Sequence, residues 1–212
     1  MRYKRISSLY LYYTTYRTKN QVFSFEIYEF FMNEGDKMAE IDAKNKRCCF
    51  TGHRPEKLFL ENDGIETVEK EIKSRLRIAV RDAVEDGLTT FITGMARGLD
   101  LWAADVVLEE KENNPDIKLI CAVPFEGFEK RWNIKEQMHY QAVLEKADFV
   151  KIVCEHYTKS CFQVRNVYMV DRVSRVIAAF NGTPGGTRNT IMYAKKCGVF
   201  VVNILEDQLP PK

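Results

Sequence analysis

The sequence has no long uncharged apolar run and almost no net charge. Its apolar segments fall short of the about 18 to 20 residues that a membrane helix needs, which excludes a membrane-spanning protein. Its 32 Lys and Arg against 30 Asp and Glu leave +2, a balance that is not typical of nucleic-acid-binding proteins. Residues 1–47 hold nine basic and six acidic residues, so the remainder has a net charge of −1. Any polyanion must therefore be bound by a local cluster of cations.

The sequence also lacks metal-binding and disulfide motifs. None of the six cysteines belongs to a CxxC pair, and the three histidines do not supply a zinc spacing. Cys48, Cys49, Cys121 and Cys154 lie in apolar runs typical of strands, where a free thiol behaves as a small buried hydrophobe. Unpaired thiols are typical of a reducing compartment. We therefore expect a cytoplasmic protein without a metal site.

Glycine is scarce at the N-terminus, where Gly35 stands alone before residue 47. Six of the ten tyrosines fall in residues 1–31, and the composition changes at Lys46 and Arg47, where strand-like sequence begins. We expect residues 1–46 to be an N-terminal extension that is poorly ordered or not native to the protein. Residues 47–212 are then expected to form a single domain, since hydrophobic residues at 45% and charged residues at 29% are typical of globular chains.

From residue 47 onward, short apolar runs alternate with amphipathic segments. Apolar residues recur every three or four positions from Ile65 to Ala83, and Gly87 and Gly198 are typical helix stops. The predicted strands are 47–51, 88–93, 117–123, 149–154, 175–180 and 199–204, and the predicted helices are 65–87, 99–111, 135–146, 164–173 and 185–196. This alternation predicts an α/β fold, a Rossmann-like doubly wound, mostly parallel sheet with helices on both faces.

The unusual residues follow the predicted strands. In a doubly wound sheet, ligands bind beyond the carboxyl ends of the strands, where the strand order reverses. Four polar or glycine-rich loops would meet at that edge and form a ligand-binding site. The predicted ligand-binding residues are Thr51, Gly52, His53, Arg54, Gly94, Arg97, Gly98, Asp100, Glu126, Asn181, Gly185, Gly186, Thr187 and Thr190.

The chemistry of these loops favours a phosphate-bearing ligand. Gly185 and Gly186 open a helix, so backbone amides and the positive end of the helix dipole can approach an anion. Arg54 and Arg97 could each bind phosphate through two hydrogen bonds, although solvated surface charge remains an alternative for both. We expect His53 to orient or stack rather than to catalyse, because the sequence offers no triad or metal partner for it.

Other residues receive different predictions. Glu126 or Asp100 is expected to accept ribose hydroxyls, although Asp100 is also a candidate helix cap. Trp102 and Trp132 are predicted to be packing residues. Residues 165–171 are predicted to complete the rim of the site or a subunit contact, through Arg165, Asn166 and Asp171.

Five segments resemble the YpsA-like family, a domain of unknown function in the SLOG superfamily, which also contains DprA/Smf and the LOG phosphoribohydrolases. They span most of residues 48–204 and are residues 49–57, 93–105, 124–127, 165–171 and 185–190. The resemblance implies a Rossmann-like fold, a pocket for a nucleotide or nucleotide derivative, and self-association. No cofactor other than this small phosphorylated ligand is expected.

The resemblance leaves three functions open, of which we favour nucleotide binding of the sensor type. An N-glycosidic hydrolase similar to LOG enzymes is the alternative, but Met192 stands where their motif has its glutamate, and methionine cannot move a proton. Glu126 and Asp100 would be the candidate catalytic residues in that case. Single-stranded DNA binding similar to that of DprA is disfavoured, because the near-neutral domain has no basic stripe with interleaved aromatics.

The composition break generates a prediction about the start of the protein. Met32 and Met38 offer later starts before the domain, and we expect the native protein to begin at or near Met38. Intact-mass measurement of the protein from its source tests this expectation. A dominant species at 24.7 kDa would contradict it.

Overall fold

The computed structural model describes residues 34–58 and 64–206. The chain divides into two units, Met1–Ala43 and Lys44–Lys212. The description begins with helix α3 (Glu34–Asn45), which reaches the start of the second unit and was not predicted from the sequence. Residues 1–33 of the predicted extension lie outside the described residues.

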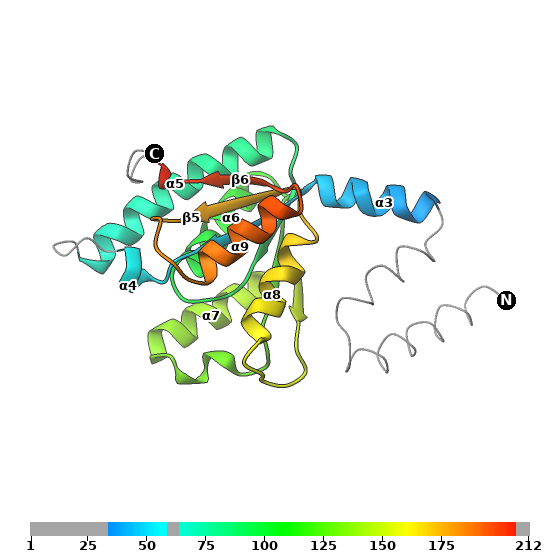
Figure 1. Ribbon diagram of the computed structural model, residues 1–212. Helices are drawn as coiled ribbons and strands as arrows, with labels where there is room; N and C mark the ends of the chain where they lie inside the picture. The colour runs from blue at the N-terminus through cyan, green and yellow to red at the C-terminus, as the bar shows by residue number, and fades with distance from the viewer. Residues whose placement is uncertain (1–33, 59–63, 207–212) are drawn as a thin grey trace. The chain divides into compact units, whose positions relative to one another are not determined.

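The second unit contains one parallel sheet of six strands (Figure 1). The strands are β1 (Arg47–Gly52), β2 (Thr90–Thr93), β3 (Lys118–Val123), β4 (Phe149–Ile152), β5 (Arg175–Ala179) and β6 (Phe200–Asn203). Their order across the sheet is β4-β3-β2-β1-β5-β6. The order reverses between β1 and β5, where Phe50 pairs with Ile177. The predicted doubly wound, Rossmann-like α/β fold is therefore confirmed.

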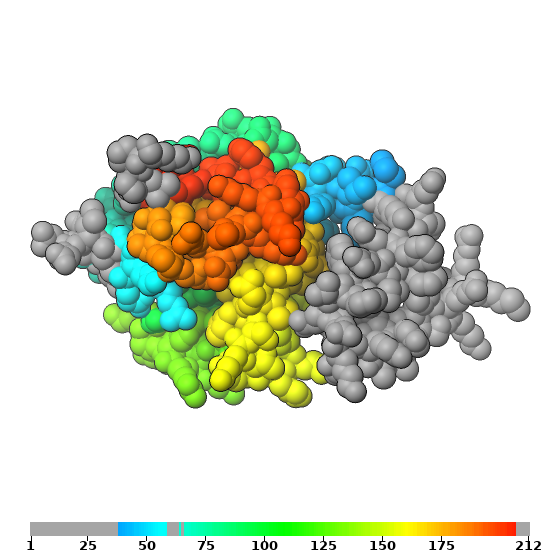
Figure 2. All heavy atoms as spheres, in the orientation of Figure 1, coloured from blue at the N-terminus to red at the C-terminus, as the bar shows by residue number. Residues whose placement is uncertain are grey.

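Helices cover both faces of this sheet. They are α4 (Pro55–Leu58), α5 (Ile65–Glu85), α6 (Leu99–Asn113), α7 (Ile134–Lys146), α8 (Cys161–Val170) and α9 (Gly186–Lys196), with a 3₁₀ turn η1 (Phe128–Arg131). Helices α8 and α9 contact each other and share the core on one face of the sheet, and in Figure 2 their yellow and orange atoms adjoin. The short α4 and η1 were not predicted, and α8 begins earlier than predicted, at Cys161.

Successive strand residues point to opposite faces and enter two separate cores. Phe50, Phe91 and Leu119 pack with α5, α6 and α7 in the larger core. Cys49 and Ile92 point the other way, toward α8 and α9. This alternation is the pleat of a strand buried on both sides, which explains why the central strands β1, β2, β3 and β5 are apolar on both faces.

The predicted helix patterns are present in the structure. On α5 the apolar stripe is buried at Val68, Ile72, Leu76, Ala79 and Ala83, while the side chain of Ile65 lies outside the described part. Helix α6 is buried on several faces, as predicted, because it packs against the sheet, α5 and α7.

No disulfide joins the cysteines in the described part of the chain. Cys48, Cys49 and Cys121 lie on strands and are fully buried, as expected. Cys154 differs, because β4 ends at Ile152 and the cysteine is only half-buried beyond it. Among the described residues, no helix is both long and apolar enough to cross a membrane.

Gly87 ends α5 with the geometry of a Schellman motif. Its φ is +88°, its N–H donates to the Val84 carbonyl at 2.9 Å, and the Leu88 N–H donates to the Ala83 carbonyl at 2.9 Å. These two bonds pair carbonyls that the end of a helix would leave without partners. The predicted stop at this residue is thus confirmed.

We expect Gly87→Ala to lower the free energy of unfolding by about 1 to 2 kcal/mol, because a Cβ disfavours the left-handed backbone. Open space surrounds Gly87, so no steric clash adds to this effect. Gly87→Asn is the matched control and should lose less, since asparagine tolerates this conformation. Urea unfolding measures both variants, and equal losses would contradict the backbone explanation.

Candidate functional site

A pocket of about 1170 Å³ lies at the carboxyl edge of the sheet, where the strand order reverses. Loops that follow β1, β2, β3, β4 and β5 contribute to its lining. Parallel strands place all of these loops on one edge, which is why segments far apart in the sequence meet there.

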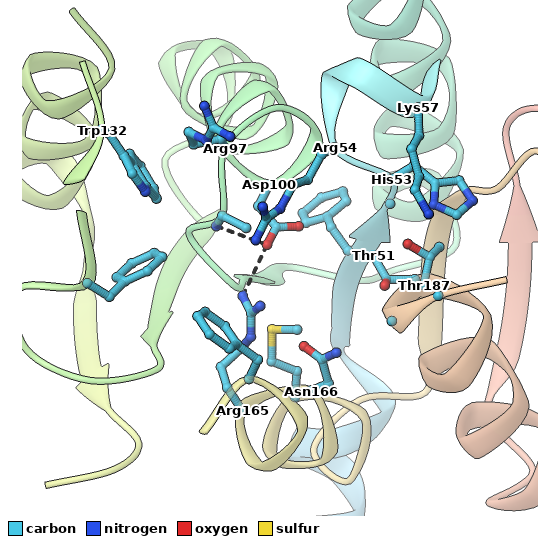
Figure 3. A pocket seen from close by; sticks show the side chains of 18 of the residues that line it. Thr51, His53, Arg54, Lys57, Arg97, Asp100, Trp132, Arg165, Asn166 and Thr187 are labelled. Atoms are coloured by element: carbon cyan, nitrogen blue, oxygen red, sulfur yellow. Dashed lines mark hydrogen bonds and ion pairs between the residues drawn. The ribbon is translucent and has the colours of Figure 1, made fainter. Parts of the chain in front are cut away.

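Nine of the predicted ligand-binding residues line this pocket, and the structure brings them together from the end of β1, the loops after three strands and the starts of two helices. They are Thr51, Gly52, His53, Arg54, Arg97, Asp100, Gly185, Gly186 and Thr187. Figure 3 shows His53, Thr51 and Thr187 on one side, with Arg54 and Arg97 nearer the middle.

Five predicted residues lie outside the lining. Glu126 is exposed, and Gly98 starts α6 against the ring of Pro55. Asn181 donates its side-chain amide to the Lys57 carbonyl at 2.7 Å, so it shapes a neighbouring loop. Gly94 and Thr190 lie outside the lining, but each is hydrogen-bonded to a lining residue.

The buried wall of the pocket contains an ion pair. Nη1 of Arg165 on α8 lies 3.1 Å from Oδ2 of Asp100 on α6 and also donates to the Gly94 carbonyl. The side chains of both are less than a tenth exposed. A Cβ at Gly94 would collide with the guanidinium, which explains the glycine at that position. Nε of Arg165 is buried and has no hydrogen-bond partner in the described part of the chain.

Asp100 also organises the loop after β2. Its Oδ2 accepts the Ala96 N–H at 3.1 Å, and its carbonyl accepts the Thr93 hydroxyl at 2.7 Å. Met95 in this loop is fully buried although its φ is +60°, a conformation unusual for a non-glycine residue. Burial raises the pKa of the Asp100 carboxyl, and the Arg165 guanidinium offsets part of that rise.

His53 is buried and packs against an aromatic ring. Its ring centroid is 5.5 Å from that of Phe180, and its Nε2 lies 3.3 Å from the Thr183 hydroxyl. Burial lowers the pKa of His53, and the nearby Lys57 ammonium lowers it further. These contacts hold the imidazole between the Phe180 ring and the Thr183 hydroxyl, and its predicted orienting role stays a prediction.

The start of α9 forms one side of the pocket. Gly185 caps the helix without a side-chain hydrogen bond, and a Cβ at Gly186 would meet open space. Thr187 is buried in the first turn. Thr190 is buried outside the lining, and its hydroxyl donates to the Gly186 carbonyl at 2.9 Å and accepts the Asn166 amide at 2.9 Å. Asn166 itself lines the pocket, whereas Asp171 accepts a bond from Tyr193 at 2.7 Å outside it.

Cations outnumber carboxylates in the lining. The six cationic lining residues are Arg54, Lys57, Arg97, Lys130, Arg131 and Arg165, and the two acidic ones are Glu56 and Asp100. This is the local cluster that the near-neutral domain requires for binding an anion. Arg97 is engaged by Glu56 at 3.2 Å and Glu136 at 3.3 Å, whereas Arg54 is exposed and has no ion-pair partner among the described residues.

Lys57 was not predicted from the sequence. Its Nζ donates to the Pro184 carbonyl at 3.3 Å and lies 3.7 Å from a Cβ built on Gly185. Helix α4 places this ammonium beside the start of α9. In the sequence, the only hint of this placement was that Lys57 stands two residues after Pro55.

Aromatic residues form the side of the pocket opposite Lys57. The rings that line it are Phe125, Phe128, Trp132, Tyr157 and Phe162. The prediction that Trp132 is a packing residue is incomplete, because the indole contacts other rings and also faces the pocket (Figure 3). Trp102 is buried, as predicted. In the sequence, the phenylalanines that follow the third predicted strand could have indicated that aromatic residues form this side of the pocket.

The fold and the loops together define a Rossmann-like domain whose candidate ligand site lies where the strand order reverses. A family model described as "YspA SLOG family" matches residues 48–197, which include every residue of the lining. UPF0398 proteins from Bacillus thuringiensis (strain Al Hakam) and Bacillus cereus (strain AH187) are each 30% identical over 154 residues, covering 70% of this chain and 82% of theirs. The chain belongs to this YpsA family of SLOG proteins, and the resemblance predicted from the sequence is confirmed.

Two solved structures have similar folds. DNA processing protein A from Streptococcus pneumoniae is 20% identical with a TM-score of 0.49, and the match covers 75% of this chain and 50% of that one. The Helicobacter pylori protein, described with a single-stranded DNA binding mode, is 14% identical with a TM-score of 0.49, over 77% of this chain and 66% of that one.

The buried ion pair generates a pH-dependent prediction. Arg165→Met should lower the free energy of unfolding at neutral pH by about 3 to 5 kcal/mol, because it leaves the Asp100 carboxylate buried without its counter-charge. The folded-state pKa of Asp100 would then lie further above its unfolded value. The deficit should be smallest below the unfolded pKa of about 4 and grow as pH rises through the folded pKa.

Urea unfolding of the wild-type and variant proteins between about pH 4 and about pH 7 measures this deficit. Arg77→Met is the matched control, since Arg77 pairs with Glu109 at 2.8 Å with its side chain 39% exposed, and it should lose less than about 1 kcal/mol. A deficit at Arg165 that is equally small and independent of pH would contradict the role of the pair.

Proposed function

We propose that the pocket binds a phosphorylated nucleotide-type ligand and acts by binding rather than by hydrolysis. The observation that carries the proposal is the placement of the Lys57 ammonium beside the glycine-rich start of α9, in a pocket whose lining holds more cationic than acidic residues. A phosphate there would meet free backbone N–H groups, the positive end of a helix dipole and side-chain cations together.

The phosphate end of the pocket is formed by Arg54, Lys57, Gly185, Gly186 and Thr187. Gly186 leaves open space for a phosphate to approach the backbone, and Thr187 in the first turn offers a hydroxyl. Lys57 stands beside this turn, and its weak 3.3 Å bond to a carbonyl can be exchanged for a charge-assisted bond to phosphate. Arg54, without an ion-pair partner in the described part, can add a second cation.

Binding without hydrolysis is supported by the placement of the carboxylates. Met192, at the position of the LOG glutamate, is 59% exposed and lies outside the lining. Glu126 is exposed and also outside it. Asp100 lines the pocket, but its Oδ2 is bound by Arg165 and the Ala96 N–H. The other acidic lining residue, Glu56, pairs with Arg97 at 3.2 Å. An acid–base group for N-glycosidic cleavage would need a carboxylate free to exchange protons with the ligand.

Thermal unfolding of the full chain with AMP, ADP, ATP, NAD, ADP-ribose and cyclic dinucleotides tests this proposal. A ligand at about 100 times its dissociation constant should stabilise the protein by about 2.7 kcal/mol. Lys57→Ala should weaken phosphate binding about tenfold, the loss of one charge-assisted bond. Gly186→Glu should abolish it by placing a carboxylate where the phosphate binds, without the clash that other glycines would give.

Two controls separate charge from folding. Gly186→Gln has similar size and no charge, so it should bind better than Gly186→Glu. Lys70→Ala removes an exposed lysine of α5 outside the lining and should leave binding unchanged. Mass spectrometry of the recovered ligand distinguishes binding from hydrolysis. No shift with any nucleotide, or salt-sensitive binding of single-stranded DNA alone, would contradict the proposal.

A further inference from the structure

The side of the pocket opposite the phosphate end is rich in aromatic side chains. We call it the aromatic end, formed by Phe125, Phe128, Trp132, Tyr157 and Phe162. Figure 3 shows Trp132 across the pocket from Lys57 and Thr187, with Arg54 between them. The two ends therefore face one cavity from opposite sides.

The rings form a connected cluster whose members meet edge to face. Phe125 contacts Phe128, Tyr157 and Phe162 with centroids 5.8, 5.1 and 5.9 Å apart, and Phe128 contacts Trp132 at 4.9 Å. The interplanar angles of these four contacts lie between 67° and 86°. Such contacts fix the orientation of each ring, so the cluster offers preformed apolar surface.

This cluster differs from a core because its rings remain accessible. Tyr157 is 63% exposed, and the other four rings are only half-buried, while Phe50 and Phe91 in the core are fully buried. Aromatic surface left open inside a pocket is stabilised when a planar apolar group covers it. The cavity of 1170 Å³ has room for such a group in addition to a phosphate.

We infer that the aromatic end binds the purine ring of the ligand by stacking, while its phosphate occupies the phosphate end. This inference rests on the proposed function and specifies the ligand as a purine nucleoside phosphate bound in one direction. Stacking on aromatic side chains suits any planar base, and purines present the larger face. The loops after β3 and β4 thus select the base, whereas the loops after β1 and β5 select the phosphate.

Calorimetric titration of the full chain with AMP and with ribose 5-phosphate tests the inference. AMP should bind at least tenfold more tightly, because only AMP carries a base to stack. Tyr157→Ala should weaken AMP binding severalfold and leave ribose 5-phosphate binding within about twofold. Tyr157 is suited to this test because its side chain is 63% exposed, so the variant should fold as the wild-type protein does. Trp132→Ala should show the same pattern. Binding of AMP should change the tryptophan fluorescence of the wild-type protein and leave that of Trp132→Ala unchanged.

Two further variants give the comparison. Phe200→Ala removes an equally exposed ring at the opposite edge of the sheet and should change neither affinity. Lys57→Ala should weaken AMP and ribose 5-phosphate binding by the same factor. Equal affinities of wild-type protein for both compounds, or equal effects of Tyr157→Ala on both, would overturn the inference and leave the proposed function standing. If neither AMP nor ribose 5-phosphate binds, the inference is overturned, whereas the proposed function is decided by the full set of nucleotides named above.

Discussion

The carboxyl edge of the sheet is held together by the ion pair between Arg165 and Asp100. Arg165 belongs to α8 and Asp100 to α6, helices that pack on opposite faces of the sheet and share no core. Their side chains meet just beyond the end of β2, where Arg165 also binds the Gly94 carbonyl. Two buried opposite charges stabilise an arrangement only while both are in place, so this contact ties the two layers together directly behind the pocket. The loop after β2, the start of α6 and the lining residue Asn166 all depend on that position.

Most of the fold could be predicted from the sequence because its signals are local. Apolar runs bounded by glycine predicted β1 and β2, and the stripe from Val68 to Ala83 with Gly87 behind it predicted α5 and its end. Helix α3 was missed because its residues have little apolar periodicity, and α4 and η1 because each is a single turn. The end of β4 was placed two residues too late, since Val153 and Cys154 continue the apolar run and their N–H groups still donate to Val123 and Pro124 beyond the end of the strand.

The candidate site could be predicted less completely, for a different reason. Glycines and arginines after strands are visible in the sequence, and nine of the predicted residues do line one pocket. Contacts between distant segments are not visible. Nothing local shows that Lys57 lies beside Gly185, or that Arg165 binds Asp100. The same holds for the aromatic side, whose rings come from two loops that meet only after β3 and β4 pair.

The pocket walls are supplied by separate loops on a common scaffold of parallel strands. Segments 125–132 and 157–162 form one side of the pocket, and residues 51–57 and 185–187 form the other. Among the described residues, no hydrogen bond, ion pair or ring contact joins the two groups. Changes at sites that share no partner add independently. Substitutions in one pair of segments can therefore change that side of the pocket and leave the other side unchanged.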